Sequence, residues 1–402
     1  MKPTAAPACC WKWVCLRNNR ATRVPLTVLQ TLPALETGGV ERGTVDVAAE
    51  LARRGHRSLV ISGGGALEAE LAAHGSHHHT WPIGRKSPVT LLLAGRLRRF
   101  LREEKVDILH ARSRLPAWVS YLAWKNMPAE DRPLFITTVH GPYRVNRYSA
   151  VMTRGQRVIA VSRYIYDYVL ANYPSADPGK ITIIQRGVDP QRYRRGYSPA
   201  ADWLDRWRSE RPQLRGKTLV TLPGRVTRWK GHADFIGIVG ELKRSGVNVH
   251  GLVAGGAAAR RRGFLKELNR LAVRRGLEHD ITFLGTRTDL REVMSVSDVV
   301  LSLANIPEAF GRTALEALSL GRPVVAYDHG GAGEVLAELQ PAGLVEPGNT
   351  NAAAEKIRAF LDAPPDIASN RTFTLERMLD MTLALYEQAR NSGGETDEKS
   401  VQ

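Results

Sequence analysis

Short apolar runs alternate with amphipathic stretches along most of the chain, from residue 27 to near residue 390. Apolar runs bounded by turn residues predict buried strands, and apolar positions recurring every three or four residues predict helices. Strands are expected at 27–32, 58–62, 107–110, 135–139, 157–161 and 181–184, and again at 218–222, 248–254, 281–284, 299–303 and 323–326. This alternation predicts an α/β protein built from βαβ units with parallel sheets.

The length of 402 residues favours two domains, and a hydrophobic content of 43% can fill two cores. The stretch 189–216 is rich in Arg, Pro and Trp and is the expected connection. We therefore predict a first domain at 24–205 and a second at 206–371. A flexible extension at 1–23 precedes them, and a long helix at 372–390 and a disordered polar tail at 391–402 follow.

Cysteine and histidine usage argues against metal and disulfide chemistry. Cys9, Cys10 and Cys15 are the only cysteines, and all precede the first predicted strand. They lack a fourth zinc ligand at suitable spacing, so free thiols in a cytoplasmic protein are expected. The histidine run 77–79 is predicted to be a solvated loop rather than a metal site. No run of 18 apolar residues occurs, so no membrane-spanning helix is expected.

The net charge of +17 is concentrated in the first half of the chain. Residues 1–200 contain 30 Lys and Arg against 14 Asp and Glu, whereas residues 201–402 contain 27 against 26. The first half should therefore face something anionic, either nucleic acid or an anionic membrane. No nucleic-acid motif is present. The predicted helix 88–105 mixes leucines with arginines, which suits a membrane-surface helix or an ordinary sheet-covering helix with a basic face.

Two carboxylates flank a Phe-Gly turn in the second half. Glu308 follows the buried run 299–303, and Gly311 allows the backbone to approach a ligand closely. The helix expected at 313–320 offers unpaired N–H groups and a positive dipole end to an anion. Glu316 within it is placed to accept hydrogen bonds from hydroxyls beside a bound phosphate. A nucleotide sugar satisfies these features together, and a plain strand–loop–helix crossover with solvated acids is the alternative.

Cations and glycines follow two other predicted strands. Arg225 and Lys230 come after the run 218–222, at the carboxyl end of a strand, where open α/β sheets bind ligands. Two cations there suit a diphosphate whose charge grows as a sugar departs. Gly38 and Gly39 lie at another strand-to-helix turn and open a helix that runs to about residue 54.

These residues together resemble glycosyltransferase family 4, the GT-B group that includes glycogen-synthase and lipopolysaccharide transferase types. The resemblance spans about residues 27–390. The family's Glu-x7-Glu element, second-domain Arg and Lys, and N-terminal Gly-Gly loop match Glu308 with Glu316, Arg225 with Lys230, and Gly38 with Gly39. Its active-site histidine context matches Thr138-Val139-His140-Gly141, and its Gly-Gly-x-x-Glu segment matches Gly330-Gly331 with Glu334. Ala309 departs from the family, where a glycine is common, and its methyl would narrow the sugar pocket.

The resemblance implies a GT-B fold, in which two Rossmann-like domains face each other across a cleft and a C-terminal helix crosses back to the first domain. It implies a retaining glycosyltransferase that moves a sugar from a nucleotide-diphosphate donor to a hydroxyl of an anionic, membrane-linked acceptor such as lipopolysaccharide core. His140, Glu308, Arg225 and Lys230 would be catalytic, with Arg225 and Lys230 holding the leaving diphosphate. The other donor-binding residues would be Gly38, Gly39, Gly285, Phe310, Gly311, Arg312, Thr313 and Glu316.

The basic, aromatic stretch after His140 supplies the acceptor-binding candidates Tyr143, Arg144, Arg147 and Arg154, with a solvated connection as the alternative. No cofactor is expected, since the nucleotide sugar is a substrate, and a UDP-sugar is favoured although the sequence does not fix the base. No Asp-x-Asp pair is present to hold a divalent metal ion, so metal-independent transfer is expected. We expect a cytoplasmic protein attached peripherally to the inner face of the membrane.

Two other functions fit the same architecture. A nucleotide-sugar epimerase would need additional acid–base residues and would give little transfer. A catalytically silent scaffold that binds a membrane or nucleic acid would not need the full set of His140, Arg225, Lys230, Glu308 and Glu316.

Overall fold

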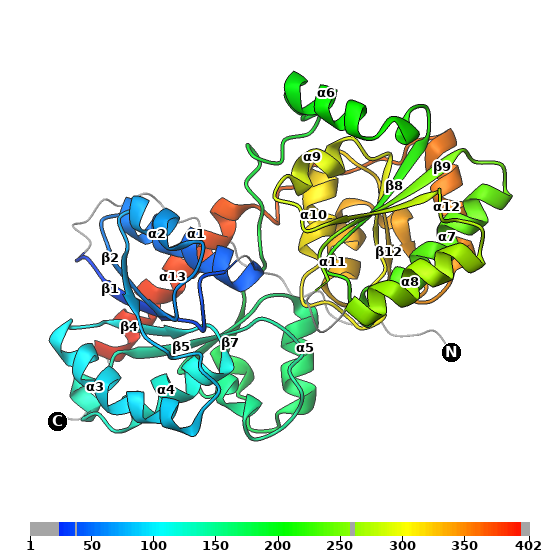
Figure 1. Cartoon of the computed structure of the whole chain (residues 1–402). Helices are drawn as coiled ribbons and strands as arrows, with labels where there is room; N and C mark the ends of the chain where they lie inside the picture. The colour runs from blue at the N-terminus through cyan, green and yellow to red at the C-terminus, as the bar shows by residue number, and fades with distance from the viewer. Residues whose placement is uncertain (1–23, 37, 258–261, 395–402) are drawn as a thin grey trace, which may run out of the picture.

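The computed structural model describes residues 24–36, 38–257 and 262–394, which form two α/β domains joined by a connecting segment (Figure 1). Each domain is built on one parallel sheet. The first sheet has seven strands in the order β3-β2-β1-β4-β5-β6-β7, and the second has six in the order β10-β9-β8-β11-β12-β13. In both sheets the strand order reverses beside the first strand of the domain, which creates a switch point where ligands bind in such folds.

The first domain follows the predicted alternation of strands and helices. Its strands are β1 Thr27–Thr31, β2 Arg57–Ser62, β3 His77–Thr80, β4 Ile108–Ala111, β5 Leu134–Val139, β6 Arg157–Ala160 and β7 Ile181–Ile183. Its helices are α1 Gly39–Arg53, α2 Glu68–Ala73, α3 Leu93–Glu103, α4 Arg114–Lys125 and α5 Arg163–Asn172, with 3-10 turns η1 Pro88–Leu92, η2 Ala129–Asp131, η3 Ser149–Thr153 and η4 Pro178–Lys180. Alternate strand residues face two cores, so the strands read as continuous apolar runs.

The second domain repeats the arrangement around the second sheet. Its strands are β8 Thr218–Pro223, β9 Val249–Ala254, β10 Ile281–Gly285, β11 Val299–Ser302, β12 Val324–Tyr327 and β13 Leu344–Val345. Its helices are α7 His232–Arg244, α8 Arg262–Arg274, α9 Leu290–Ser295, α10 Arg312–Ser319, α11 Gly330–Leu339 and α12 Thr350–Asp362, with 3-10 turns η5 Pro212–Leu214, η6 Arg228–Lys230 and η8 Pro341–Gly343. The two-residue strand β13 was not predicted because two residues are too short for a periodic signal.

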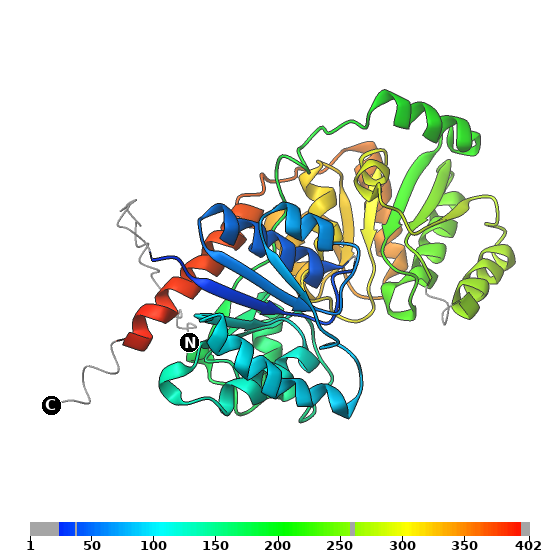
Figure 2. The same ribbon diagram turned by 60° about the vertical axis from the view of Figure 1, so that its left-hand side comes forward.

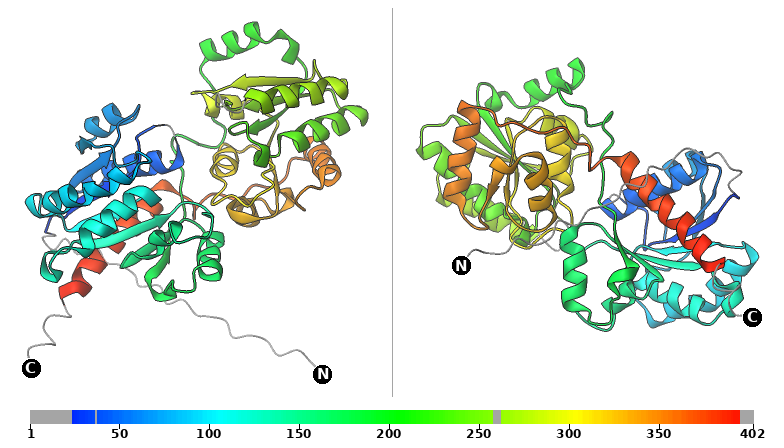
Figure 3. Two further views of the ribbon diagram at one scale, coloured as in Figure 1. Left: turned by 60° about the horizontal axis from the view of Figure 1, so that its bottom comes forward. Right: turned by 180° about the vertical axis from the view of Figure 1, so that it is seen from behind.

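Two helices show how the domains are divided. Helix α6 (Ala201–Glu210) packs on the second domain, where Trp207 is buried and the Trp203 indole donates to Asp289 at 2.8 Å. The boundary expected at residue 205 falls inside this helix, so the second domain begins before α6. The last helix, α13 (Leu375–Gly394), returns to the first domain and lies against it (Figures 2 and 3). Its Leu383 and Tyr386 are buried there, as the GT-B resemblance implies.

A carboxylate of the second domain caps a helix of the first. Glu334 on α11 accepts hydrogen bonds from the backbone N–H groups of Arg163, at 3.0 Å, and Tyr164, at 2.5 Å. These are orphan donors in the first turn of α5, and an acid there also complements the helix dipole. These two hydrogen bonds of Glu334 therefore connect the second domain to the first, beside the cleft between them.

Two expectations for the first domain were wrong. The histidine run forms the edge strand β3, in register with Leu59–Ile61 of β2, rather than a loop. The run has no apolar residue, but His78 bonds Ser62 at 2.8 Å on one face and His79 packs on Phe100 on the other. The predicted helix 88–105 is divided into η1 and α3, and η1 leaves Val89 and Leu92 exposed.

No helix among the described residues is both long and apolar enough to cross a membrane.

Candidate active site

A cleft of about 810 Å³ lies between the two domains, at the carboxyl ends of both sheets. Loops that follow β1, β5 and β7 form its first-domain wall, and loops that follow β8 and β11 form its second-domain wall. This is the edge where parallel sheets bind ligands. The structure brings most of the predicted site residues to it, namely Gly38, Gly39, His140, Arg225, Lys230, Glu308, Phe310, Gly311, Arg312 and Thr313.

Lys230 and Glu308 form the central ion pair of the second-domain wall. The Lys230 Nζ lies 2.6 Å from the Glu308 Oε1, and both side chains are about 15% exposed (16% and 15%). The next residue, Gly231, has a φ of +72° and lies against the carbonyl of Leu303, so a side chain would not fit there. The glycine therefore sets the direction in which Lys230 leaves η6. Arg225, in the same loop, is exposed and forms no ion pair with any described residue.

Gly311 places the start of α10 at the cleft. Its φ of +74° is left-handed, and a Cβ atom there would lie 2.5 Å from the Cα of Ala332 on α11. Only glycine allows this packing, and it places the first turn of α10, with Arg312, Thr313 and the unpaired N–H groups of a helix start, at the border of the cleft. Arg225, Lys230 and the N-terminus of α10 thus converge on one wall of the cleft. Cations beside a helix N-terminus form an arrangement that binds phosphate groups.

Glu316 does not reach the cleft. It lies one turn further along α10, is 6% exposed, and accepts a hydrogen bond from the Arg312 Nε at 2.9 Å. Its other close neighbour is Tyr193, whose pKa rises to about 12 because the phenol is buried, with Glu316 adding to the effect. Arg312, which does line the cleft, therefore engages one oxygen of the Glu316 carboxylate.

The structure leaves the other predicted binding residues outside the cleft. Gly285 ends β10 and does not line it, and neither do the acceptor candidates Tyr143, Arg144, Arg147 and Arg154. After Pro142 the chain folds onto α4 and α5, where the Tyr143 carbonyl accepts from the Tyr168 hydroxyl at 2.6 Å. Arg154 lies over the rings of Trp118 and Tyr121, and Arg144 and Arg147 face solvent.

His140 is held in one tautomer by an arginine. The Arg186 Nη2 lies 2.7 Å from the His140 Nδ1, and a guanidinium can only donate, so Nδ1 accepts. Burial, reinforced by Arg186, holds the pKa of His140 well below its usual range. The neutral ring therefore carries its proton on Nε2, which is buried and has no hydrogen-bond partner in the described part of the chain. The cleft thus contains a preoriented donor beside the first-domain wall.

Sequence reasoning missed Arg186 and Asp46, both of which line the cleft. Arg186 follows the predicted strand 181–184, so the strand-end rule applied to Arg225 and Lys230 would have found it. Asp46 lies on α1, where nothing in the sequence distinguishes it from a solvated acid. Burial raises the pKa of Asp46, although Arg312 and three other arginines oppose the shift.

No group of three His, Cys, Asp or Glu side chains is placed to hold a metal ion within the described ranges. The predicted cysteine tail, residues 1–23, lies outside those ranges.

Comparison with known proteins assigns the family. The profile of Glycosyltransferase Family 4 matches residues 37–192, and that of Glycosyl transferases group 1 matches residues 205–372. The crystal structure of a glycosyltransferase from Rickettsia africae ESF-5 is 30% identical, covers 91% of this chain and 98% of its own, and superposes with a TM-score of 0.79.

Two further relatives extend over nearly the whole chain. D-inositol 3-phosphate glycosyltransferase from Rhodococcus opacus (strain B4) is 24% identical over 93% of this chain and 92% of its own. The Anabaena protein HepE, crystallised with UDP, shares the fold at a TM-score of 0.70, with 21% identity over 93% of this chain and 100% of its own. The family profiles, the 30% identical structure and the paired Rossmann-like domains together make this chain a GT-B glycosyltransferase that belongs to glycosyltransferase family 4.

Proposed function

We propose that the enzyme transfers a sugar from a nucleoside-diphosphate sugar to a hydroxyl of an anionic acceptor, with retention of anomeric configuration. The observation that carries this proposal is the convergence of Arg225, Lys230 and the N-terminus of α10 on one wall of the cleft. A diphosphate leaving group gains negative charge as its bond to the sugar breaks, and fixed cations and N–H donors aimed at it stabilise that charge.

Residues on both walls have roles in this reaction. Lys230 exchanges Glu308 for the diphosphate, which frees the Glu308 carboxylate to accept hydrogen bonds from sugar hydroxyls. His140 donates its Nε2 proton to a sugar oxygen. A Cβ atom at Gly39 would meet no heavy atom within 4 Å beyond its chain neighbours and its own helix, so position 39 leaves space for phosphate oxygens.

The bonding changes balance without a protein nucleophile. The acceptor oxygen bonds to the anomeric carbon on the face that the diphosphate leaves, and the bond between that carbon and the diphosphate oxygen breaks. The electron pair stays on the diphosphate, whose oxygen takes the hydroxyl proton. Same-face attack within a close ion pair retains configuration, as the family resemblance implies.

Two relatives support the proposed donor base and acceptor class. UDP in the HepE crystal supports a UDP-sugar donor. The acceptor named for the Rhodococcus relative is D-inositol 3-phosphate, a phosphorylated polyol, which supports an anionic acceptor. A phosphorylated lipopolysaccharide core has the same chemistry and suits the basic first half of the chain.

A surface of the first domain supports peripheral attachment to a membrane. Val89, Leu91 and Leu92 on η1 are 67%, 38% and 77% exposed. Exposed cations surround them in sequence, namely Arg85, Lys86, Arg96, Arg98 and Arg99. Apolar side chains with a basic surround suit the headgroup region of an anionic membrane. We call these eight residues the η1 patch.

Nucleotide release tests the proposed function. UDP-, GDP- and ADP-sugars are incubated with the enzyme alone, then with D-inositol 3-phosphate or a bacterial lipid extract. One donor should release nucleotide faster when an acceptor is present, and NMR of the product should give the donor's anomeric configuration. Release that no acceptor accelerates, together with an epimerised sugar, would instead identify an epimerase. A scaffold would show neither release nor thermal stabilisation by a nucleoside diphosphate.

A further inference from the structure

Two arginines of the first domain meet beneath the Gly-Gly loop. Arg112 follows β4 and Arg186 follows β7, at the carboxyl edge of the first sheet. Their guanidiniums lie beside Gly43 on α1. A Cβ atom at position 43 would collide with the Arg186 Nη1 and would lie 3.4 Å from the Arg112 Nη2. A residue without a side chain at position 43 therefore makes room for the pair.

The positive charge of this pair is only partly offset by the described residues around it. Neither guanidinium forms an ion pair with a described carboxylate. Arg112 is 3% exposed and donates to the Gln30 Oε1 at 2.5 Å, but its Nε is buried and has no partner within the described chain. The acid that acts on both is Asp46, whose own burial raises its pKa. Burial, with Arg112 and Arg312 adding, lowers the pKa of Arg186 to about 9.

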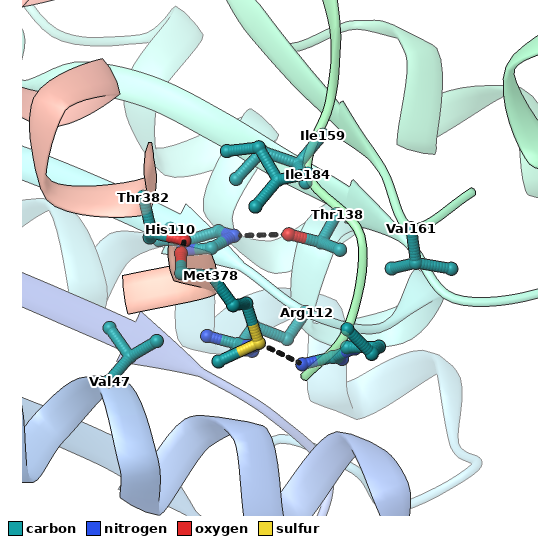
Figure 4. Close-up of a pocket in the computed structure, with 10 residues that line it drawn as sticks. Val47, His110, Arg112, Thr138, Ile159, Val161, Ile184, Met378 and Thr382 are labelled. Atoms are coloured by element: carbon teal, nitrogen blue, oxygen red, sulfur yellow. Dashed lines mark hydrogen bonds between the residues drawn. The ribbon is translucent and has the colours of Figure 1, made fainter. Parts of the chain in front are cut away.

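An anionic ligand can reach Arg186 from the cleft, which this residue lines. Both arginines also line a second, small pocket of about 10 Å³, which has room for about one water molecule. Figure 4 shows this side, where Arg112 lies between the sheet and Met378 of α13, with Val47 and Ile184 among the walls. Arg186 lines this cavity and also the interdomain cleft. One side therefore has room only for about one water molecule, whereas the other opens into the large cleft.

We propose that Arg186, backed by Arg112, binds a phosphate group of the acceptor, which rests on the proposed transfer to an anionic acceptor. Arg186 uses one donor on His140 and one on the Met378 sulfur, and its remaining N–H groups can bind two oxygens of a phosphate. The cations expected to hold the donor diphosphate, Arg225 and Lys230, come from the opposite domain. A phosphate on Arg186 would therefore lie against the first-domain wall of the cleft, next to the His140 ring and across from those two cations.

Anchoring at this point has a consequence for geometry. Arg186 contacts His140, so a phosphate bound to it fixes the acceptor within reach of the sugar that His140 faces. Arg112, which does not line the cleft, acts as a positioning residue that maintains the positive field and the placement of Arg186. The acceptor class that fits is a phosphate monoester of a polyol or sugar, whether free or lipid-linked.

Binding of inorganic phosphate to the full-length enzyme, with the donor pocket saturated by UDP, tests the proposal. Calorimetry should give one phosphate site in the wild type, and Arg186→Gln should weaken it about 30-fold, the scale of losing charge-assisted hydrogen bonds. Arg186→Lys should retain part of the affinity, which guards against a folding defect in the first variant. Arg208→Gln, which replaces a surface arginine of α6, is the matched control and should bind phosphate normally.

Four results separate the interpretations. Equal phosphate affinity in Arg186→Gln and the wild type would overturn the proposal, because the titration would then report an adventitious ion only. A loss of UDP affinity in Arg186→Gln that matches the loss in Arg225→Gln would assign Arg186 to the donor diphosphate and overturn it as well. In transfer assays with Arg186→Gln, a KM that rises for D-inositol 3-phosphate but not for lipid extract would identify a free phosphate monoester as the acceptor. A KM that rises for lipid extract but not for D-inositol 3-phosphate would identify a lipid-linked acceptor. Nucleotide release without any acceptor dependence would reject the proposed function, which the phosphate titration does not measure.

Discussion

The ammonium of Lys230 and the carboxylate of Glu308 lie 2.6 Å apart, although one follows β8 and the other follows β11. The pair neutralises two groups that are mostly buried in the cleft wall and that both have roles in the proposed reaction. A ligand with a diphosphate next to a polyol would separate them, giving the phosphate to Lys230 and the hydroxyls to Glu308. The ion pair thus holds both side chains in position, and a bound ligand can replace each partner.

Substitution of Lys230 by Ala should lower kcat/KM by about 10²–10³-fold, or about 2.7–4 kcal/mol of transition-state stabilisation, because a preorganised cation at the leaving group is lost. Steady-state transfer kinetics measure the effect. In a double-mutant cycle, Glu308→Gln should be less harmful in the Lys230→Ala background, since the two residues share one interaction. Lys243→Ala is the matched control, because Lys243 pairs with Asp280 at the far end of α7 and should be nearly silent in activity. Near-normal transfer by Lys230→Ala would contradict its role.

The sequence was sufficient to predict the paired α/β domains and most of the cleft, because strand ends and glycine turns are local features. Lys230, Glu308 and Gly311 were found in this way. Arg186 obeys the same rule but was not considered, and it emerged only when its contact with His140 was seen. Glu316 was placed correctly on its helix, but its pairing with Arg312 depends on side-chain packing that spacing does not reveal.

Other differences have the same origin in tertiary contacts. All residues of β3 are polar, so its own sequence does not predict a strand. It forms a strand because it pairs in register with β2. The acceptor candidates Arg144 and Arg147 were chosen for charge, yet the path of the chain after Pro142 carries them away from the cleft. Local patterns therefore predict elements and their ends, whereas the direction of a side chain beyond the first turn of a loop comes from packing.

Stability should fall as the pH is lowered from 6.5 toward 4, because buried histidines stay neutral in the folded chain. Burial lowers the pKa of His232 and of His250 to about 4, and each side chain is 1% exposed. Below pH 6.5 the unfolded chain binds protons that the folded chain does not, so the stability is complete above pH 6.5 and is lost on acidification. Each histidine should contribute about 1.4 kcal/mol per pH unit in this window.

Urea unfolding of the wild type and of His250→Gln at several pH values between 7.5 and 4.5 measures this slope. Glutamine can still bond Thr282, the partner of His250, so the fold should be preserved. The slope for the variant should be smaller by about one proton. An unchanged slope would mean that His250 takes up its proton in the folded state.

Two glycines of the site should respond to alanine in opposite ways. Gly311→Ala should lower the free energy of unfolding by about 2–4 kcal/mol, because a left-handed φ and the backbone of Ala332 both oppose a Cβ atom. Gly39→Ala should be stable, since no atom beyond its chain neighbours lies within 4 Å of the added carbon, yet it should raise the donor KM about tenfold or more by pointing a methyl into the cleft. Thermal unfolding and donor titration distinguish the two, and a fully active Gly39→Ala enzyme would remove that glycine from the donor loop.

The η1 patch should bind anionic vesicles and ignore neutral ones. Phosphatidylglycerol vesicles attract the arginines, at about 1 kcal/mol for each cation near the surface, and raising the salt from about 0.1 to about 0.5 M should weaken binding because the charges are screened. Replacing Val89, Leu91 and Leu92 together by Ser should reduce binding about tenfold or more, since their exposed side chains can no longer enter the headgroup region.

Val273→Ser provides the control for that experiment, because Val273 is 59% exposed on the second domain and lies outside the patch. Co-sedimentation with vesicles measures the bound fraction for all variants, and transfer to a free phosphorylated acceptor should stay unchanged in the triple serine variant because the patch lies outside the cleft. Binding that depends on neither anionic lipid nor salt would reject the membrane surface. Equal losses in the triple variant and Val273→Ser would show that the association comes from general surface hydrophobicity instead.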